Sequence, residues 1–338
     1  MNHAGRPNQA LIARQLGVSI STVSRALANE PGISERVRRE VQEVARSIGY
    51  RAKRTSPADG QRHQVPALFP VRSLTGGLSG FYEGIVTGMR SAAAAAGIDL
   101  DVRLVRDAHV TPEQVERYLA DRGARGLLLG GIDPSEELAA WCLKREVGLI
   151  LVNGSDPKMR FSSAAPANFY GGRAATEQLL AAGHRRIVHL TYQNRHTIYE
   201  RTRGFEAAIA ACPGASGRVV AIDQPRRRPA DLMAELLAEG DAFTAVFCMN
   251  DLIAVDVLES RDLRRAELPE SFSVMGFDDL PCASMTSPRL STIRVDREAI
   301  GRAAIALLRR KLAGEMPVVE QVEIGLTLVA GGTIFRCP

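Results

Sequence analysis

Near its N-terminus the chain reads LIARQLGVSISTVSRAL over residues 11–27, the pattern of two short helices joined at a glycine. Leu11, Ile12 and Leu16 recur at helical spacing and predict a first helix with one apolar face. Gly17 can adopt the positive φ that allows one helix to end and another to begin at a steep angle. The stretch therefore predicts a helical hairpin, which is either an ordinary packing unit or a helix-turn-helix.

The second helix of this hairpin is predicted to have a polar, basic outer face. Ser19 stands where an N-cap belongs, and Val23, Ala26 and Leu27 form the inner stripe. The opposite face carries side chains that can reach base edges and phosphates in a DNA major groove, namely Ile20, Ser21, Thr22 and Arg25. This face favours the helix-turn-helix interpretation.

A third helix is predicted after the turn at Pro31 and Gly32. Ser34 is its expected N-cap, and Gly49 is its expected end. Its apolar face repeats at helical spacing through Val37, Val41, Val44 and Ile48. Three short helices of this kind make a small DNA-reading module, which needs a second copy or another domain to gain affinity and site length.

Positive charge is concentrated in the segment that contains these helices. The 338 residues carry a net charge of +5. Residues 1–65 hold 11 Lys and Arg against 5 Asp and Glu, whereas the rest of the chain holds 32 against 33. A local excess of this sign is what binding to the phosphate backbone of DNA requires.

The size and the cysteine usage indicate a large protein of a reducing compartment. A chain of 338 residues, 45% of them apolar, suits two or three domains with a sizeable core. The five cysteines are scattered without a CxxC pair, which argues against both a disulfide framework and a metal site. No apolar leader and no run of 18 apolar residues is seen. We expect a cytoplasmic protein with no metal and no cofactor.

A linker separates the N-terminal helices from a segment of different character. Residues 51–64 are polar, basic and broken by Pro57 and Gly60. Beyond them apolar runs alternate with helical stretches, which predicts parallel α/β units. The expected strands are 65–69, 100–105, 126–129, 147–152, 186–190, 219–222, 245–248 and 272–276, and the expected helices are 82–96, 112–122, 134–145, 171–182, 201–211, 229–237, 251–259 and 297–313. So many strands favour two sheets, with a ligand between them at the carboxyl ends of the strands.

Several short motifs follow one another along the chain in a recognisable order. They are Gly17-Val18-Ser19 with Thr22-Val23-Ser24-Arg25, Gly183-His184-Arg185-Arg186-Ile187, Asn250-Asp251, Gly276-Phe277-Asp278-Asp279, Leu290-Ser291-Thr292-Ile293 and Ile300-Gly301. In this order and spacing the chain resembles the lactose-repressor (LacI/GalR) family of bacterial transcription regulators over nearly its whole length.

The resemblance implies an α/β protein of two parts. A three-helix helix-turn-helix headpiece would cover 1–50 and a hinge 51–64, and the remaining 65–338 would fold like a periplasmic sugar-binding protein into two doubly wound parallel-sheet lobes. Lobe 1 is expected at about 65–165 and 294–324, and lobe 2 at about 166–293 and 325–338. The resemblance further implies a nucleoid-associated homodimer, a repressor that binds a pseudo-palindromic operator and responds to a small carbohydrate effector.

The resemblance also assigns residues to DNA contact. Ile20, Ser21 and Arg25 match the base-reading positions of the family, and Arg25 has the planar fork that suits a bidentate contact to guanine. The positions that contact the DNA backbone correspond to Ser19, Thr22 and Ser24. For Ser19 and Ser24, capping and packing are the alternative roles.

The hinge departs from the family pattern. Asp59 stands where the family has a leucine that wedges into the minor groove, and a carboxylate near phosphates carries a large electrostatic cost. Pro57 would disturb all but the first turn of a hinge helix. We expect instead a basic tether that contacts phosphates through Arg51, Lys53 and Arg54.

In the expected core, the polar effector-binding positions of the family correspond to Asn153, Arg201, Asn250 and Asp278. Such a set suits a polyol, because sugar hydroxyls donate and accept hydrogen bonds at once. Arg201 is expected on the first turn of a helix, with a solvated surface charge as the alternative. Asp251 is expected to be the N-cap beside a ligand-binding Asn250. Phe81 and Tyr82 fall where the family lines its pocket, either to stack on a sugar ring or to pack in the core.

Two other classes of protein compete with a regulator. An α/β enzyme would need a catalytic motif, and the chain has no glycine-rich phosphate loop, HExxH, nucleophile elbow or Cys/His cluster. A periplasmic-type sugar-binding protein would share the core, but the basic head and the lack of a signal peptide argue against it. We therefore expect a regulator and not an enzyme, and a dimer and not a tetramer because no heptad tail follows the last strand.

Overall fold

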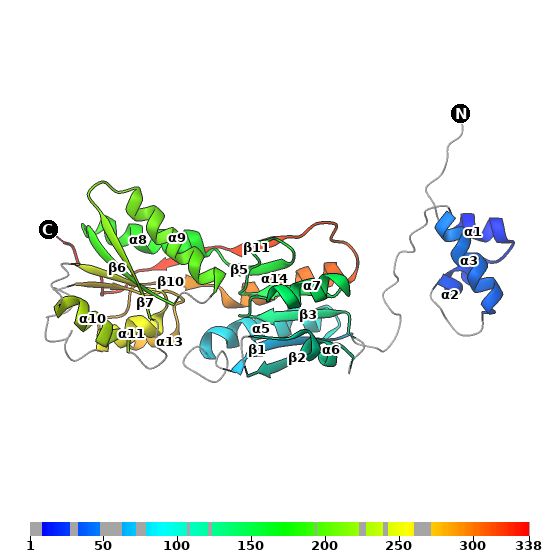
Figure 1. Cartoon of the computed structure of the whole chain (residues 1–338), viewed down its shortest axis with the longest axis horizontal. Coiled ribbons are helices and arrows are strands. Elements are labelled where there is room, and N and C mark those ends of the chain that lie inside the picture. Colours follow the sequence, from blue (N-terminus) through cyan, green and yellow to red (C-terminus); the bar gives the residue numbers. More distant parts are fainter. Residues whose placement is uncertain are drawn as a thin grey trace, which may run out of the picture. The chain divides into compact units, whose positions relative to one another are not determined.

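The structure of the protein is a computed structural model that describes residues 9–27, 33–47, 63–71, 79–106, 109–120, 124–192, 195–222, 228–238, 243–259 and 272–337. Two compact units share the chain, Met1–Gln61 and Arg62–Pro338 (Figure 1). In the residues described, no helix combines the length and the apolar character needed to cross a membrane.

The N-terminal unit contains three helices, α1 (Gln9–Leu16), α2 (Ile20–Leu27) and α3 (Glu35–Ser47). Gly17 has a φ of +63°, which lets the chain turn sharply between α1 and α2, as predicted. The three helices bury a common apolar core of Ile12, Ala13, Val23, Ala26, Val41 and Ala45. Leu11 was expected in this core but lies on the surface, because Ile12 and Ala13 supply the inner face of α1.

The larger unit begins with a six-stranded parallel sheet in the order β11-β5-β4-β3-β1-β2. Its strands are β1 (His63–Pro70), β2 (Ile98–Val105), β3 (Gly126–Gly130), β4 (Gly148–Val152), β5 (Ser162–Pro166) and β11 (Gln321–Ile324). Helices α5 (Ser79–Ala95), α6 (Pro112–Ala120), α7 (Glu136–Lys144) and α14 (Arg297–Leu312) flank it. We call this sheet with its helices lobe 1.

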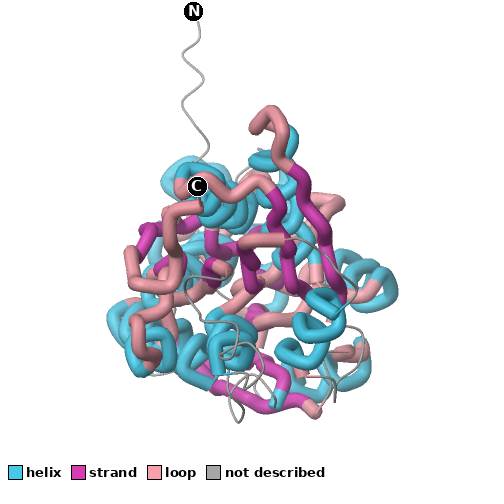
Figure 2. Tube along the Cα trace, turned by 90° about the vertical axis from the view of Figure 1, so that its left-hand side faces the viewer, coloured by secondary structure: helices cyan, strands magenta, loops and turns pink. Residues whose placement is uncertain are grey.

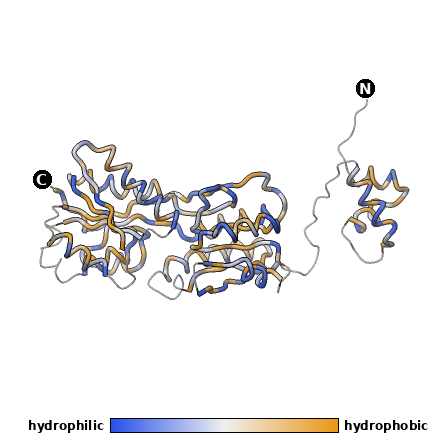
Figure 3. The backbone as a smooth tube through the Cα atoms, viewed as in Figure 1, coloured by the Kyte–Doolittle hydropathy of each residue, from blue (hydrophilic) through white to orange (hydrophobic). Residues whose placement is uncertain are grey.

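Both faces of the lobe 1 sheet are covered, so its inner strands are apolar on both sides. Leu128 and Ile150 pack in the cluster that includes α5 and α14, whereas Leu127, Leu129 and Leu149 pack with α6 and α7. Figure 2 shows the strands between layers of helix, and Figure 3 shows hydrophobic residues concentrated along the strands.

Lobe 2 is built on a four-stranded parallel sheet in the order β7-β6-β8-β9. Its strands are β6 (Arg186–Thr191), β7 (Ser216–Ala221), β8 (Ala245–Cys248) and β9 (Ser273–Met275). Its helices are α8 (Asn168–Ala181), α9 (His196–Ala210), α10 (Pro229–Ala238), α11 (Asp251–Glu259) and α13 (Pro281–Met285). An antiparallel pair, β10 (Thr292–Val295) with β12 (Leu326–Val329), completes the lobe.

The chain passes between the lobes at single residues. Ala167 separates β5 from α8, Asp296 separates β10 from α14, and Gly325 separates β11 from β12. The predicted combination of a three-helix unit and a core with two parallel sheets is confirmed. The short strands β5, β10, β11 and β12 and the helix α13 were not predicted.

Candidate functional sites

The outer face of α2 presents the side chains predicted to contact DNA. Ser19, Ser21 and Arg25 are exposed, and Thr22 and Ser24 are half-buried. Ile20 is 54% exposed although it is apolar, so the core of the unit does not account for its position.

Ser19 caps α2, as predicted. Its hydroxyl accepts a hydrogen bond from the backbone N–H of Thr22 at 3.0 Å and lies 2.7 Å from the Ser21 hydroxyl. The cap leaves the hydroxyl on the surface, so capping and phosphate contact are compatible. The hinge residues Arg51, Lys53, Arg54, Pro57 and Asp59 lie outside the described residues.

In the larger unit, polar residues gather at the carboxyl ends of the parallel strands. Asp133 and Asn153 follow β3 and β4 of lobe 1, and Arg195, Asn250 and Asp278 follow β6, β8 and β9 of lobe 2. This is the edge at which open α/β sheets bind ligands, and we call these five residues the interlobe cluster.

Arg195 links the two lobes across this edge. Its Nη1 donates to the Tyr82 hydroxyl at 2.8 Å and to the Gly131 carbonyl at 3.2 Å. Its Nη2 donates to the Asn153 carbonyl and to the Thr197 hydroxyl, both at 2.7 Å. Gly131 has a φ of +65°, and a Cβ at that position would collide with the Tyr82 hydroxyl, so the close approach requires glycine.

Arg201 and Asp278 form a buried pair in lobe 2, with 3.6 Å between Nη2 and Oδ1. Asn168 fixes the guanidinium by accepting from Nε at 2.9 Å, the Met249 carbonyl accepts from Nη1, and the guanidinium lies 3.7 Å from the centre of the Phe277 ring. Arg201 is thus buried and not a solvated surface charge. It was expected on the first turn of its helix, but α9 begins at His196, so it lies on the second turn.

Among the residues that the structure describes, one amide oxygen and one carboxylate oxygen of this region are buried without a hydrogen bond. Asn153 Oδ1 and Asp278 Oδ1 accept none from the part of the chain that the structure describes, although Asn153 Nδ2 donates to the Tyr82 hydroxyl at 3.1 Å. Burial raises the pKa of Asp278 to about 6, while Arg201, Arg297 and Arg195 act to lower it. Unsatisfied acceptors of this kind are uncommon in buried regions, and they suit a ligand that brings hydroxyl donors.

Two predictions about neighbouring residues are corrected by the structure. Asn250 and not Asp251 caps α11, because Asn250 Oδ1 accepts from the Ile253 N–H at 3.0 Å. Asp251 turns inward, where its carboxylate accepts from the Leu280 N–H at 2.6 Å and from the Thr292 hydroxyl. Burial raises the pKa of Asp251 to about 8.

The two aromatic residues expected at the pocket pack in the core of lobe 1. Phe81 and Tyr82 are both almost fully buried, and their rings meet edge to face with centroids 5.2 Å apart. The Tyr82 hydroxyl, which binds Asn153 and Arg195, is the part of the side chain that reaches the interlobe cluster. The structure therefore supports the core-packing alternative for both rings.

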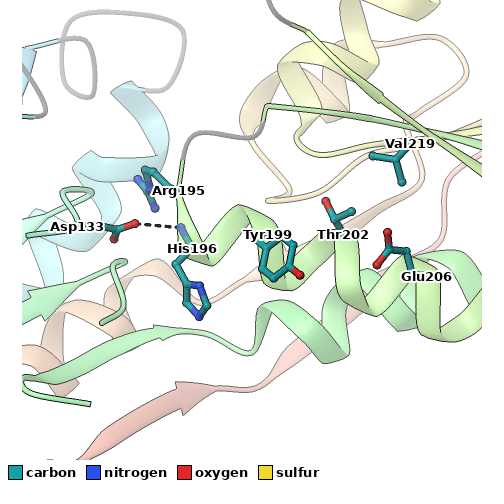
Figure 4. A pocket seen from close by; sticks show the side chains of 7 residues that line it. All are labelled: Asp133, Arg195, His196, Tyr199, Thr202, Glu206 and Val219. Carbon is teal, nitrogen blue, oxygen red and sulfur yellow. Dashed lines mark hydrogen bonds between the residues drawn. The ribbon is translucent and has the colours of Figure 1, made fainter. Parts of the chain in front are cut away.

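A pocket of about 520 Å³ opens beside the cluster, along one face of α9 (Figure 4). Its lining begins at Asp133 and Arg195 and continues through His196, Tyr199, Thr202, Glu206 and Val219. Arg195 and Asp133 were not predicted as site residues. Their positions just after strands β6 and β3 are the sequence signal that could have indicated them.

Comparison with known proteins agrees with this architecture. Residues 12–53 match the family model described as bacterial regulatory proteins, lacI family, and residues 176–334 match a periplasmic binding protein-like domain. The transcriptional regulator GntR of Pseudomonas aeruginosa is 32% identical over 96% of this chain and 95% of its own length. GalR of Escherichia coli is 28% identical over 96% of this chain and 93% of its own.

Solved structures show the same fold. A CelR–cellobiose complex superposes with a TM-score of 0.69 at 25% identity, and covers 97% of this chain and 100% of its own. A lac repressor dimer bound to operator and an anti-inducer gives a TM-score of 0.68 at 22% identity, and covers 98% of this chain and 100% of its own.

A DNA-reading three-helix unit followed by a two-lobed binding-protein core defines a ligand-responsive class of transcription regulator. The chain belongs to the LacI family of bacterial regulatory proteins. It is a DNA-binding transcriptional regulator, and the relatives named above are regulators and not enzymes.

Proposed function

We propose that the protein is a homodimeric repressor that binds a pseudo-palindromic operator in the bacterial cytoplasm and is controlled by a small polyhydroxylated effector held between its lobes. Ile20, Ser21 and Arg25 read base edges, and Ser19, Thr22 and Ser24 contact the DNA backbone. Arg51, Lys53 and Arg54 add phosphate contacts from the hinge.

The observation that carries the effector site is a pair of buried oxygens that accept no hydrogen bond from the described residues, Asn153 Oδ1 in lobe 1 and Asp278 Oδ1 in lobe 2. Each oxygen could accept a hydrogen bond from a sugar hydroxyl, so one ligand would satisfy an acceptor from each lobe. Arg201 holds Asp278 in place, and the Tyr82 hydroxyl holds Asn153. The cellobiose complex of the structural neighbour CelR supports a carbohydrate effector.

The DNA-binding part of the proposal is tested by selecting bound sequences from random duplex DNA with the purified full chain. We expect a sequence with two inverted half-sites, bound at least about 10³-fold more tightly than random DNA at physiological salt. Duplexes that carry one half-site should bind more weakly, because only one headpiece of the dimer can then reach its cognate bases. Equal affinity for selected and random DNA would contradict the proposal.

A further inference from the structure

Arg195 carries a positive charge into the interlobe cluster and forms no ion pair with a carboxylate among the described residues, although Asp133 and Asp278 lie close enough to favour its charged form. A guanidinium has five N–H donors and cannot lose its charge in a protein. Four of these donors are used by neutral acceptors, which are the Tyr82 hydroxyl, the Gly131 and Asn153 carbonyls and the Thr197 hydroxyl. The fifth, on Nε, is buried and has no partner among the residues that the structure describes.

The carboxylates nearest to Arg195 bind other groups. Asp133 accepts from the backbone N–H of His196 at 3.0 Å and from that of Ser155 at 3.3 Å, and Figure 4 shows it turned toward His196 beside Arg195. Asp278 lies against Arg201. Arg297 is a further cation close enough to lower the pKa of Asp278. Neither Asp133 nor Asp278 therefore offers a carboxylate oxygen directly to the Arg195 guanidinium.

A buried N–H donor without an acceptor is costly, and an anion with hydrogen-bond acceptors would remove that cost while pairing directly with the guanidinium charge. From this geometry we infer that the effector is an acidic sugar or polyol, whose carboxylate or phosphate accepts from Arg195 Nε while its hydroxyls donate to Asn153 and Asp278. The inference rests on the proposed function, since it assigns the charge of the proposed effector.

Arg195 also connects the two lobes through its hydrogen bonds. It follows β6 of lobe 2, whereas Tyr82, Gly131 and Asn153 belong to lobe 1. An anion bound at Nε would therefore act on the side chain that joins the lobes, so ligand charge and lobe geometry are linked through one residue.

The test is calorimetric binding to the full chain with a panel matched in carbon skeleton: D-glucose, D-glucitol, D-gluconate, D-glucuronate and glucose 6-phosphate, with the corresponding pentose, galactose and mannose series. We expect an acidic member to bind at least about tenfold more tightly than its neutral counterpart. The carboxylate and phosphate members of each series distinguish the two anion types.

The variants are Arg195→Gln, which keeps hydrogen-bond donors but removes the charge, and Arg203→Gln as the matched control on the exposed face of α9. Arg195→Gln should lose most of the preference for the acidic ligand, and Arg203→Gln should keep it. If neutral members bind as tightly as acidic ones, or if Arg195→Gln keeps the preference, the inference is wrong while the proposed function stands. If no member of either kind binds, the proposed effector site itself fails, and the inference fails with it.

Discussion

Asn153 and Asp278 hold backbone conformations that side-chain-bearing residues rarely adopt. Their φ angles are +48° and +105°. At Asp278 the backbone is fixed by pairing with β10, where its N–H donates to the Ile293 carbonyl at 2.8 Å. Positive φ at non-glycine residues is often found at functional sites, where the surrounding structure imposes it. Here it directs the two side chains whose oxygens accept no hydrogen bond from the part of the chain that the structure describes.

Asp251 provides a prediction about pH at this scale. Burial raises its pKa from 3.8 to about 8, so between these values the folded state binds a proton that the unfolded state lacks. The contribution of this group to stability is therefore full below about pH 4 and declines as the pH rises toward 8. Asp251→Asn removes this titration, and the Thr292 hydroxyl can turn to accept from the new amide.

We expect the stability of Asp251→Asn to fall furthest below that of wild type at pH 5 and to equal or exceed that of wild type by pH 8. Denaturant unfolding midpoints at pH 5, 6, 7 and 8 measure this. Asp256→Asn, on the same helix, serves as a control because its carboxylate is not fully buried and pairs with Arg228. A constant difference between Asp251→Asn and wild type over the whole range would contradict the assignment of a raised pKa to Asp251.

At the scale of elements, α2 is the part that distinguishes a DNA reader from a plain helical hairpin. Arg25 is exposed on its outer face, five residues after the exposed Ile20. Arg25→Ala should weaken binding to the selected operator by roughly 1–3 kcal/mol and relax the preference at one base pair of each half-site.

The measurement for Arg25 is fluorescence anisotropy on the selected operator, on its single-base variants and on random DNA. Arg36→Ala, an exposed arginine of α3, should change affinity for all of these duplexes to a similar extent. If Arg25→Ala also lowers affinity equally on cognate and random DNA, Arg25 contacts only phosphate.

The elements that could be predicted from the sequence are those with a local signal. The apolar run 245–248 and the helix 251–259 were predicted with the bounds that β8 and α11 have. β5, with the sequence SSAAP, has no such run, and β12 pairs with β10 more than thirty residues away. These strands owe their existence to tertiary pairing, which periodicity does not report.

The residues of the candidate site likewise divide into those that have a signal in the sequence and those that depend on tertiary contacts. Asn153, Arg201 and Asp278 could be proposed because they match the polar effector-binding positions of the family that the chain resembles. Arg195 belongs to none of the motifs, and its role depends on Tyr82 and Gly131, more than sixty residues away along the chain. A single sequence gives no indication of such partners.

At the scale of the whole molecule, the core consists of two lobes joined by short connections. The chain crosses between the lobes only at single residues, Ala167, Asp296 and Gly325, within the residues described. Such crossings allow two packed lobes to move as units, and a ligand that binds one arrangement better shifts the balance toward it. The headpiece belongs to a separate compact unit, so we expect that substitutions in the core can remove the response to the effector and leave DNA binding intact.

The most direct test of effector control through the interlobe site is operator binding by Asp278→Asn, measured with and without the tightest ligand of the sugar panel. Without ligand, the variant should bind the selected operator as wild type does. With ligand, the variant should need at least about tenfold more ligand than wild type to change its operator affinity. The reason is that its side chain no longer offers a charged oxygen to accept hydrogen bonds from the ligand hydroxyls. Asp279→Asn, whose carboxylate pairs with Arg289 and Arg294, should respond as wild type does. A response of Asp278→Asn at the wild-type ligand concentration would contradict the account.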